Sequence, residues 1–479
     1  MTFYCTLMTY DETIKFLYSL EKFGIKLGLE SISNLLVLLN DPHQKFKSIH
    51  IAGTNGKGST AAMIASILQC AGYKTALYTS PHLQDFRERI RINGVMIPEE
   101  DVIELTELIR NRIYNHSELS LTFFEFTTAM AFLYFAREKV DFAVVEVGMG
   151  GRLDATNVLN SVLSIITEID IEHTEHLGED IKSITREKGG IIKENGITIL
   201  SSNKTDVVEV IESICKEKNA KLYRIGKDYI GEKENTDIHS QQFKFRDMSL
   251  RGKAEAISHY FEIPLLGKYQ IINASTAIKA SLILPSLIPP LQRGGSRGGV
   301  KIDESAIREG LKNVKWSGRL EIVAENPIII LDGAHNPAAA KVLSEELKEL
   351  KYRNQKPEVR SQNKLILVIG ILKDKDYKGI ISFLAPISDY IIIAKPKTLR
   401  AREPEDLKTE SLKYLPPPAS HHKWGRNKVG GLMERVVIIE DISEAVLRVK
   451  NLASTDDLIC ITGSFFTVGE ARKWVTKMA

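Results

Sequence analysis

Seven consecutive residues have the types and spacing of a phosphate-binding loop. An apolar stretch, 48–52, is followed by Gly53, Thr54, Asn55, Gly56, Lys57, Gly58 and Ser59, and then by a helical stretch, 61–71. Glycines let the backbone wrap around a phosphate, and successive N–H groups at a helix amino terminus attract the anion. The Lys57 ammonium could reach the β- and γ-phosphates, and the Ser59 hydroxyl could bind Mg²⁺.

This loop departs from the usual G-x-x-x-x-G-K-[ST] pattern, because Gly58 stands between the lysine and the serine. A structural glycine turn is therefore the alternative interpretation. The strand before the loop and the helix after it favour nucleotide binding.

Three further residues have ligand types that suit a divalent cation. Glu146 lies near the end of an apolar run, 142–147, where an ionised carboxylate is costly without a cation. Ser80 precedes a proline, and by itself it would indicate a turn. His173 and another histidine three positions later could be a zinc pair, but no third ligand of suitable spacing follows, which disfavours zinc.

A second polar loop lies in the carboxy-terminal third of the chain. The apolar run 328–331 is followed by Asp332, Gly333, Ala334, His335, Asn336 and Pro337, which open a predicted helix. Ligands of α/β folds bind at the carboxyl ends of strands. Asp and Asn are also good turn and cap residues, but Asp, His and Asn clustered beside a glycine favour a functional role.

Short β-branched runs alternate with helical patterns along most of the chain, which predicts parallel sheets with active loops at the strand carboxyl ends. The first series has predicted strands at 48–52, 142–147 and 162–166, and predicted helices at 61–71, 99–113 and 269–284. The second series has predicted strands at 328–331, 365–369, 390–393, 436–439 and 458–461.

The fold class is therefore predicted as α/β, with two domains. Residues 1–315 would form a P-loop domain with a doubly wound, mostly parallel sheet, and residues 316–479 a smaller Rossmann-like domain. Residues 226–263 are polar and alternating, which indicates a β insertion packed on the first domain. Two segments rich in Pro, Gly and basic residues, 285–299 and 416–431, are predicted to be solvated loops.

Composition excludes some classes of function. The hydrophobic fraction of 43% and charged fraction of 26% are ordinary for a folded protein of 479 residues, and the net charge of +3 gives no argument for nucleic acid or an anionic membrane. The four cysteines form no C-x-x-C pair, which fits a reducing cytoplasm. The longest apolar stretch, 123–135, is interrupted by Glu125 and falls short of a membrane span. We expect a cytoplasmic monomer that acts on small molecules.

Ten segments, in the same order, resemble motifs of the bifunctional folylpolyglutamate synthase/dihydrofolate synthase family of the Mur ligase superfamily. They are AGTNGKGST, TSPHL, ERIRING, TFFEFTTAMAF, EVGMGGRLDATN, IEHTEHLG, REKGGIIK, WSGRLE, LDGAHNP and ITGSFF. The two predicted loops fall between these segments, as tolerated insertions would. Lys268-Tyr269-Gln270 stands where the family commonly has a histidine before the glutamine.

The resemblance implies an ATP-dependent, ADP-forming ligase that joins L-glutamate to dihydropteroate, to a folate, or to both. The acid would take the γ-phosphoryl group to give an acyl phosphate, which the glutamate amine then attacks. A monovalent cation is a further candidate cofactor beside ATP and two Mg²⁺ ions.

The resemblance also implies roles for individual residues. Lys188 would be carbamylated, which requires a neutral amine that captures CO₂; without the resemblance it would be interpreted as a surface lysine. The implied ATP contacts are Thr54, Asn55, Gly56, Lys57, Gly58, Ser59, Asn273, Arg319 and Asp332, with His335 near the transferred phosphate. The implied metal ligands are Ser59, Ser80, Glu146 and His173. The implied acid-binding residues are Phe86, Arg89, Thr122, Phe124, Asp154 and Ala155. Phe124 could equally be ordinary core, and Asp154 could cap a helix.

Three alternatives stay open at this point. A cell-wall Mur ligase acting on a UDP-sugar peptide is the nearest, although TSPHL and TFFEFTTA favour folate. A P-loop switch or nucleotide-regulated binding module is disfavoured by the DGAHNP loop and by Glu146 with His173. A non-catalytic homologue is disfavoured because every charged catalytic position of the motifs is present.

Overall fold

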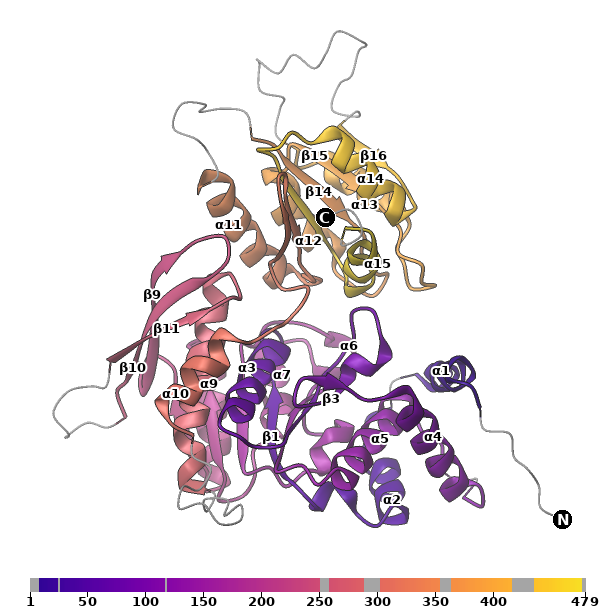
Figure 1. Ribbon diagram of the computed structural model, residues 1–479, viewed down its shortest axis with the longest axis vertical. Coiled ribbons are helices and arrows are strands. Elements are labelled where there is room, and N and C mark those ends of the chain that lie inside the picture. The colour runs from indigo at the N-terminus through magenta and orange to yellow at the C-terminus, as the bar shows by residue number, and fades with distance from the viewer. Residues whose placement is uncertain are drawn as a thin grey trace, which may run out of the picture. The chain divides into compact units, whose positions relative to one another are not determined.

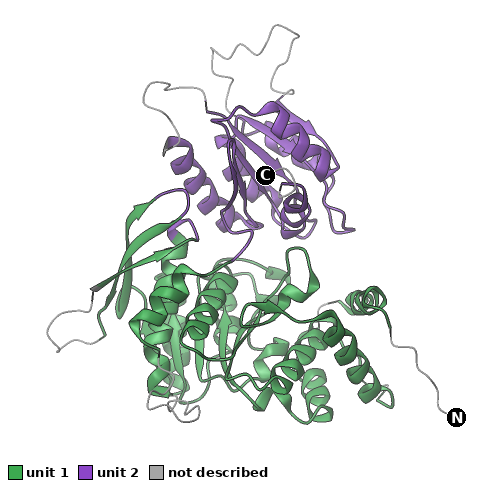
Figure 2. Ribbon diagram, in the orientation of Figure 1, with its two compact units in different colours: residues 1–236, 240–264, 269–315 green, residues 237–239, 265–268, 316–479 purple. Residues whose placement is uncertain are grey.

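The computed structural model describes residues 8–24, 26–116, 119–249, 258–287, 302–353, 363–415 and 435–475. The chain divides into two compact units (Figure 2). The first consists of residues 1–236, 240–264 and 269–315, and the second of residues 237–239, 265–268 and 316–479.

An eight-stranded sheet forms the centre of the first unit (Figure 1), in the order β4-β3-β2-β5-β1-β6-β7-β8. The six strands from β2 to β8 in that order pair in parallel, and β3 and β4 add an antiparallel edge. The α/β class is confirmed, and the first three predicted strands are the neighbours β5, β1 and β6. The bounds are β1 Lys47–Ala52, β2 Thr75–Tyr78, β3 Ile90–Ile92, β4 Val95–Met96, β5 Phe142–Glu146, β6 Leu163–Ile166, β7 Ile197–Leu200 and β8 Lys221–Arg224.

Helices cover this sheet, and its central strands β1, β5 and β6 are buried at every position except Lys47, as expected for parallel strands that are covered on both faces. One apolar core joins α1, α2, α4 and α5 to β2 and β5, and another joins α7 and α8 to β6 and β7. The bounds are α1 Tyr10–Ser19, α2 Glu30–Leu38, α3 Lys57–Cys70, α4 Glu99–Ile113, α5 Phe123–Arg137, α6 Thr174–Leu177, α7 Ile181–Gly189, α8 Thr205–Glu217, α9 Lys268–Leu287 and α10 Glu304–Lys312.

Two predicted helix boundaries were wrong. The helix expected at 61–71 begins at Lys57, because the glycine-rich turn is complete at Gly56 and the last residues of the motif already form the first helical turn. Helix α9 continues through Pro285 to Leu287, so the start of the loop expected at 285–299 is helical. A proline in the last turn removes few backbone hydrogen bonds. Residues 288–299 and 416–431 lie outside the described residues.

The predicted β insertion is a three-stranded antiparallel sheet with the order β11-β10-β9. Alternate residues of β10 are buried, as expected for a strand with one packed face. It belongs mainly to the first unit, although residues 237–239 group with the second. The bounds are β9 Tyr229–Thr236, β10 Gln241–Asp247 and β11 Ser258–Ile263.

The second unit contains a six-stranded sheet with the order β12-β13-β17-β14-β15-β16. All pairs are parallel except β12 with β13. The five strands predicted for this region all occur, with β16 ending one residue earlier and β17 one residue later than expected. The bounds are β12 Glu321–Glu325, β13 Ile328–Leu331, β14 Leu365–Ile369, β15 Tyr390–Ile393, β16 Val436–Ile438, β17 Leu458–Thr462, α11 Pro337–Arg353, α12 Tyr377–Leu384, α13 Pro404–Leu412, α14 Ile442–Leu452 and α15 Phe465–Val475.

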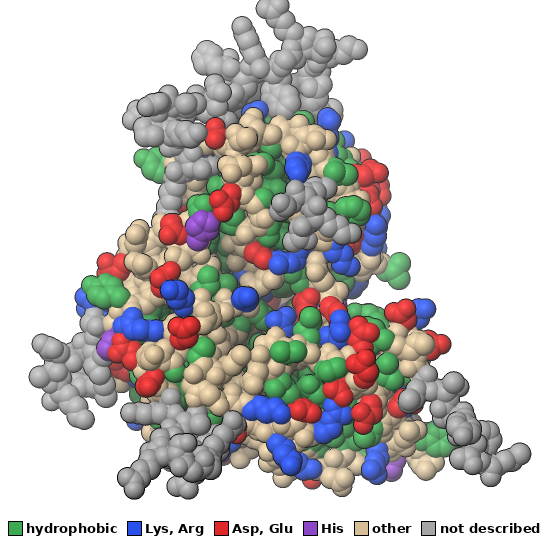
Figure 3. Space-filling view, viewed as in Figure 1, with side chains coloured by type: hydrophobic (Ala, Val, Ile, Leu, Met, Phe, Trp, Pro, Cys, Tyr) green, Lys and Arg blue, Asp and Glu red, His purple; other side chains and the backbone are tan. Residues whose placement is uncertain are grey.

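Acidic and basic side chains are interspersed on the face shown in Figure 3, in keeping with the near-neutral net charge. Within the described ranges, no helix has both the length and the apolar character needed to cross a bilayer.

Candidate active site

The glycine-rich loop follows the central strand β1 and depends on two of its glycines. Gly53 has a φ of +152° and Gly56 a φ of +90°. A Cβ atom on Gly53 would lie 1.9 Å from Thr167 Oγ1, and one on Gly56 would lie 2.5 Å from Asn273 Oδ1. Both positions therefore require glycine, and the turn directs the chain into α3, whose first N–H groups have no partner within the helix.

The first residues of the loop are fastened to the segment after β6. The N–H groups of Thr54 and Asn55 donate to the carbonyl oxygen of Glu168, at 2.7 and 3.2 Å, and Thr54 Oγ1 donates to the carbonyl of Asp170 at 3.0 Å. These two residues hold the loop in place, so the N–H groups that remain for an anion begin at Gly56.

Two lysine ammonium groups converge on one carbonyl oxygen of this loop. Lys57 Nζ and Lys188 Nζ each lie 2.9 Å from the oxygen of Gly53. Lys188 also pairs with Glu172 Oε1 at 2.8 Å, and its side chain is only 2% exposed. The interpretation of Lys188 as a surface lysine is therefore wrong.

The electrostatics of this cluster follow from its burial. Burial lowers the pKa of Lys188, while the adjacent Glu172 carboxylate acts in the opposite direction. Burial alone would raise the pKa of Glu172, but Lys188 and Lys57 together lower it to about 2. Glu172, which the sequence analysis missed although it lies in IEHTEHLG, is thus the counterion of the lysine pair.

Close backbone packing explains how Lys188 becomes buried. A Cβ on Gly151 would lie 2.7 Å from the carbonyl oxygen of Glu187, and one on Gly190 would lie 2.4 Å from Arg152 Cβ. The Arg152 N–H donates to the Glu187 carbonyl at 2.8 Å. The glycines of EVGMGGRLDATN and REKGG therefore allow the end of α7 to lie directly against the loop after β5.

Glu146 and Ser80 are brought together at the carboxyl end of the sheet. Glu146 is the last residue of β5, its register partner in β1 is Ile51, and it is 5% exposed. The Ser80 N–H donates to Glu146 Oε2 at 3.0 Å. His173, directly after Glu172, is the N-cap residue of α6 and has a φ of +49°.

The donor set fits Mg²⁺ better than a softer metal. Carboxylate and hydroxyl oxygens from Glu146, Ser80 and Ser59 are hard ligands, and Mg²⁺ takes few protein ligands beside water and phosphate oxygens. Among the described residues, no group of three or more His, Cys, Asp and Glu side chains could hold a metal by itself.

Helix α9 contacts the loop from a distant part of the sequence. Gln270 Nε2 donates to Ser59 Oγ at 3.3 Å, and Asn273 Nδ2 donates to Gln270 Oε1 at 2.9 Å. Residues three apart share one helix face, so Gln270 and Asn273 together meet the loop, the latter against Gly56. Gln270 was missed as a site residue.

An aromatic wall contains two of the predicted acid-binding residues. The Arg89 guanidinium lies 5.2 Å from the Phe123 ring centroid, and Phe86 meets the same ring edge-on at 6.2 Å. Tyr18 stacks on Phe123 with centroids 5.6 Å apart, and its hydroxyl lies 3.1 Å from His82 Nε2. Burial, with the nearby Arg89, lowers the pKa of His82 to about 3, so this imidazole is neutral. Tyr18 precedes the recognised segments, and nothing in its spacing marked it.

The other predicted acid-binding residues serve structural contacts as well. Thr122 caps α5 in a reciprocal pair with Glu125. A Cβ on Gly148 would lie 2.5 Å from the Phe124 ring, so Phe124 rests directly on the loop after β5. Asp154 accepts the Met149 N–H at 2.8 Å and caps the short 3₁₀ turn Ala155–Val158, in which Ala155 is buried.

The polar loop of the second unit is built around a buried carboxylate. Asp332 is 6% exposed, and its two oxygens accept the N–H groups of Leu320 and Ala334, both at 2.8 Å. Burial raises the pKa of Asp332, and the nearby Arg319 opposes that shift. The buried Asp332 carboxylate therefore fixes the conformation of the DGAHNP loop through these two hydrogen bonds.

One aromatic ring contacts two half-buried candidate residues of this unit. The Arg319 guanidinium lies 4.4 Å from the Phe465 ring centroid, and the His335 ring lies 5.5 Å from the same centroid. His335 Nδ1 is 2.8 Å from the Gly333 carbonyl, which orients its ring. Phe465 belongs to ITGSFF but was not singled out from the sequence.

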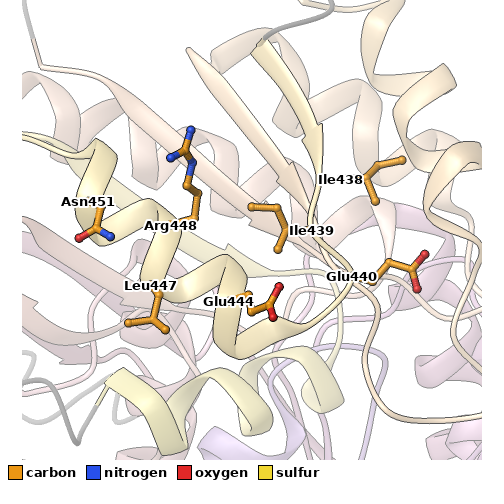
Figure 4. Close-up of a pocket in the computed structure, with 7 residues that line it drawn as sticks. All are labelled: Ile438, Ile439, Glu440, Glu444, Leu447, Arg448 and Asn451. Carbon is orange, nitrogen blue, oxygen red and sulfur yellow. The ribbon is translucent and has the colours of Figure 1, made fainter.

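A separate pocket lies between β16 and α14 (Figure 4), lined among others by Ile438, Glu444 and Arg448. Strand β16 is at the edge of the sheet opposite to β12 and β13. This pocket is therefore remote from the Asp332 loop.

Two domain families match the chain over both of its units. The Mur ligase middle domain matches residues 51–281, and the Mur ligase glutamate ligase domain matches residues 318–465. Together with the P-loop and the second α/β unit, these matches define the chain as a protein with the middle and glutamate ligase domains of the Mur ligases.

Relatives that align over nearly all of this chain identify its family more specifically. The chain is 31% identical to the dihydrofolate synthase/folylpolyglutamate synthase of Bacillus subtilis, over 97% of this chain and 98% of the relative. It therefore belongs to the dihydrofolate synthase/folylpolyglutamate synthase family. It is also 33% identical to a probable bifunctional folylpolyglutamate synthase/dihydropteroate synthase of Halobacterium salinarum, over 98% of this chain but 52% of the relative, so it spans about half the length of that protein.

Solved structures agree with this assignment. A folylpolyglutamate synthase from Thermotoga maritima has a TM-score of 0.76 at 36% identity and covers 98% of this chain and 97% of its own. E. coli FolC, in complex with DHPP and ADP, has a TM-score of 0.78 at 29% identity, covering 97% and 98%. The enzyme from Yersinia pestis, complexed with AMPPNP and Mn ion, has a TM-score of 0.76 at 28% identity, covering 97% and 98%.

Proposed function

We propose that this chain is an ADP-forming ligase that joins L-glutamate to dihydropteroate, to the γ-glutamyl end of a folate, or to both. The observation that carries the proposal is the Gly53–Ser59 loop at the end of β1 with the Glu146 carboxylate at the end of the neighbouring strand. This arrangement fits a triphosphate with a divalent cation, and family membership supplies the class of acid and amine.

The proposed reaction couples phosphoryl transfer to amide formation. The acid carboxylate attacks the γ-phosphorus, giving an acyl phosphate and ADP, and the glutamate amine then displaces phosphate from the carbonyl carbon. Both the attacking carboxylate and ATP are anionic, so the site must supply positive charge and aligned N–H groups. We assign these tasks to Lys57 and to the N–H groups from Gly56 to Ser59.

The metal roles rest on the hard-oxygen character of the donors. Ser59, Ser80 and Glu146 would hold one Mg²⁺ together with nucleotide oxygens, and His173 would contribute to a second. A bound Mg²⁺ supplies charge neutralisation at the transferred phosphate. In the second unit, Arg319 and His335 would contact the nucleotide. Phe465 would orient the guanidinium and the imidazole, and Asp332 would fix the conformation of the DGAHNP loop.

We also propose that Lys188 is carbamylated in the active enzyme. Burial lowers the pKa of Lys188, which promotes the neutral amine that attacks CO₂, while the ion pair with Glu172 acts in the opposite direction. Mass spectrometry of the intact metal-loaded protein under CO₂ should show a mass gain that Lys188→Arg abolishes. Unmodified lysine under these conditions contradicts the modification. Turnover in K⁺ against choline salts tests the monovalent cation.

The acid would bind beside Phe86, Arg89 and Phe124, near the loop that contains Asp154 and Ala155, with Thr122 fixing the start of α5. These side chains combine aromatic surface with a guanidinium, which suits a flat heteroaromatic acid. We further infer that the protein is cytoplasmic, in line with the free cysteines among the described residues, and that it is a monomer that acts on small molecules. Sedimentation analysis tests the monomer.

The decisive experiment places ¹⁸O in the carboxylate of the acid. Dihydropteroate and a reduced folate are offered separately with ATP, Mg²⁺ and L-glutamate, and the products are analysed by mass spectrometry. An acyl phosphate transfers one ¹⁸O to the released phosphate, and the products reveal which acid is used. Unlabelled phosphate, or phosphate release independent of the acid, would exclude the mechanism and favour a nucleotide switch. A UDP-sugar peptide offered in parallel tests the cell-wall alternative.

A further inference from the structure

A buried chain of hydrogen bonds connects the central strand β1 to the loop after β5. His50 Nε2 lies 2.8 Å from Thr156 Oγ1, and that oxygen lies 2.5 Å from Asp154 Oδ1. His50 and Thr156 are fully buried, and Asp154 is 5% exposed. Neither His50 nor Thr156 has a part in the proposed chemistry, so this chain needs a separate account.

The direction of each hydrogen bond follows from the protons available. Burial raises the pKa of Asp154, but the hydrogen bonds that its carboxylate accepts lower it. Oδ1 accepts the Thr156 hydroxyl and the Thr156 N–H, the latter at 3.0 Å, and Oδ2 accepts the Met149 N–H at 2.8 Å, so both oxygens act as acceptors, as in an ionised carboxylate. The single hydroxyl proton of Thr156 is therefore donated to Asp154. Towards His50 the hydroxyl can only accept, so His50 must carry its proton on Nε2.

The remaining nitrogen of His50 is informative. Nδ1 is buried and has no hydrogen-bond partner among the described residues. An unprotonated nitrogen tolerates that position better than a buried N–H of a cationic ring would. The charged group that acts on the imidazole is Lys193, whose Nζ donates to Asn157; burial first, and Lys193 second, lower the pKa of His50 to about 3. The imidazole is thus neutral near pH 7.

The chain ends at the proposed acid-binding loop. Asp154 accepts hydrogen bonds from the N–H groups of Met149 and Thr156, which lie near the two ends of the loop 148–156. These bonds fix the conformation of the loop. The Phe124 ring lies on Gly148 at one end of that loop. If the Thr156 hydroxyl changes its orientation, we expect the loop 148–156, against which Phe124 packs, to shift as well.

We propose that His50 is a positioning residue for acid binding: its Nε2–H orients the Thr156 hydroxyl, which holds Asp154 and the loop 148–156 in the conformation that receives the organic acid. The identity of the ligand rests on the proposed function, whereas the tautomer and the hydrogen-bond chain do not. The glycine-rich loop Gly53–Ser59 is held by other contacts, so we expect the affinity for the nucleotide not to depend on the hydrogen bonds of His50 and Thr156.

The first test needs no substrate. In protein labelled with ¹⁵N-histidine, His50 is assigned by its loss in His50→Gln. We expect a protonated Nε2 and an unprotonated Nδ1, unchanged between pH 5.5 and 8.5. A proton on Nδ1, or titration within that range, overturns the proposal whatever the enzyme does.

The second test uses paired variants in the ligase assay. His50→Met removes the donor at similar volume, and Thr156→Val removes the hydroxyl, and each should raise KM for the acid by about tenfold, the scale of one buried hydrogen bond lost with a partner left unsatisfied. KM for ATP should stay within about twofold. His50→Gln places an amide N–H near the position of Nε2, and Thr156→Ser keeps the hydroxyl, so both should restore most of the affinity.

The outcomes distinguish the positioning role of His50 from the proposed ligase function. A folded His50→Met enzyme with unchanged KM for the acid, or equal defects in His50→Met and His50→Gln, contradicts the positioning role. Absence of ligase activity in the wild type contradicts the proposed function and leaves the NMR result to decide the hydrogen-bond chain. If His50→Met does not fold, Thr156→Val against Thr156→Ser gives the same comparison.

Discussion

Lys188 and Glu172 form an ion pair, with Nζ and Oε1 2.8 Å apart, next to the glycine-rich loop Gly53–Ser59. The lysine side chain is 2% exposed and the glutamate side chain 12%. The same ammonium donates to the Gly53 carbonyl, so the pair connects α7 to the first residue of the loop. A buried charge pair of this kind is costly to break, because either partner alone leaves an uncompensated charge.

While Lys188 is unmodified, we expect this ion pair to make the stability of the protein sensitive to acid. Burial would raise the pKa of Glu172, but Lys188 and Lys57 lower it from 4.5 to about 2. The folded state therefore binds this proton more weakly than the unfolded state, and the stabilisation is complete above about pH 4.5 and is lost as the pH falls towards 2. Denaturant unfolding should show a Glu172→Gln destabilisation of about 3 kcal/mol at pH 7 that shrinks below pH 4.5. A penalty that does not change with pH would contradict the assignment.

Lys57 should be essential for turnover and dispensable for folding. Its ammonium donates hydrogen bonds to the carbonyl oxygens of Gly53 and Thr54, and Glu172 keeps its ion pair with Lys188 without it, so Lys57→Ala removes a positive charge and little packing. We expect ADP formation to fall by about 100-fold or more, with a thermal midpoint close to that of the wild type. Lys45→Ala, at an exposed lysine before β1, is the matched control and should keep full activity. Near-normal turnover in Lys57→Ala would refute the role.

Gly56 and Asn273 should be coupled in stability. An alanine at position 56 adds left-handed strain and places its Cβ 2.5 Å from Asn273 Oδ1. Gly56→Ala should cost roughly 1–3 kcal/mol. In the Asn273→Ala background the same change should cost less, because the close contact is removed and only the backbone strain remains. Equal costs in the two backgrounds, measured by urea unfolding, would show that the contact does not matter.

Phe465 and Phe466 offer a matched pair in the second unit. Phe465 lies under the Arg319 guanidinium, with centroid distance 4.4 Å, and next to His335, whereas Phe466 is 41% exposed. Phe465→Leu should reduce kcat/KM for ATP by about threefold to thirtyfold, the scale of one cation–π contact. Phe466→Leu should have little effect. Similar kinetics for the two variants would remove Phe465 from the site.

Local patterns in the sequence predicted most of the elements, because strand and helix periodicities are local properties. The run 142–147 became β5, and the helix at 99–113 had the observed bounds. The loop of glycines with Lys57 and Ser59 was also evident, since its chemistry lies within seven residues. The start of α3 was placed too late because the motif and the helix share residues 57–59.

Contacts between distant segments could not be predicted in this way. By its local sequence alone, Lys188 resembles a surface residue. In the structure it is buried, because Gly151 and Gly190 allow the end of α7 to lie directly against the loop after β5. Gln270 reaches Ser59 across 211 positions, and Tyr18 reaches Phe123 from outside the recognised motifs. Sequence alone determined which chemistry the phosphate loop can perform, because glycine flexibility and lysine charge are properties of the residues themselves. Only the tertiary structure decided which buried charges face each other, because burial and pairing depend on where the sheet and helices place residues far apart in the chain.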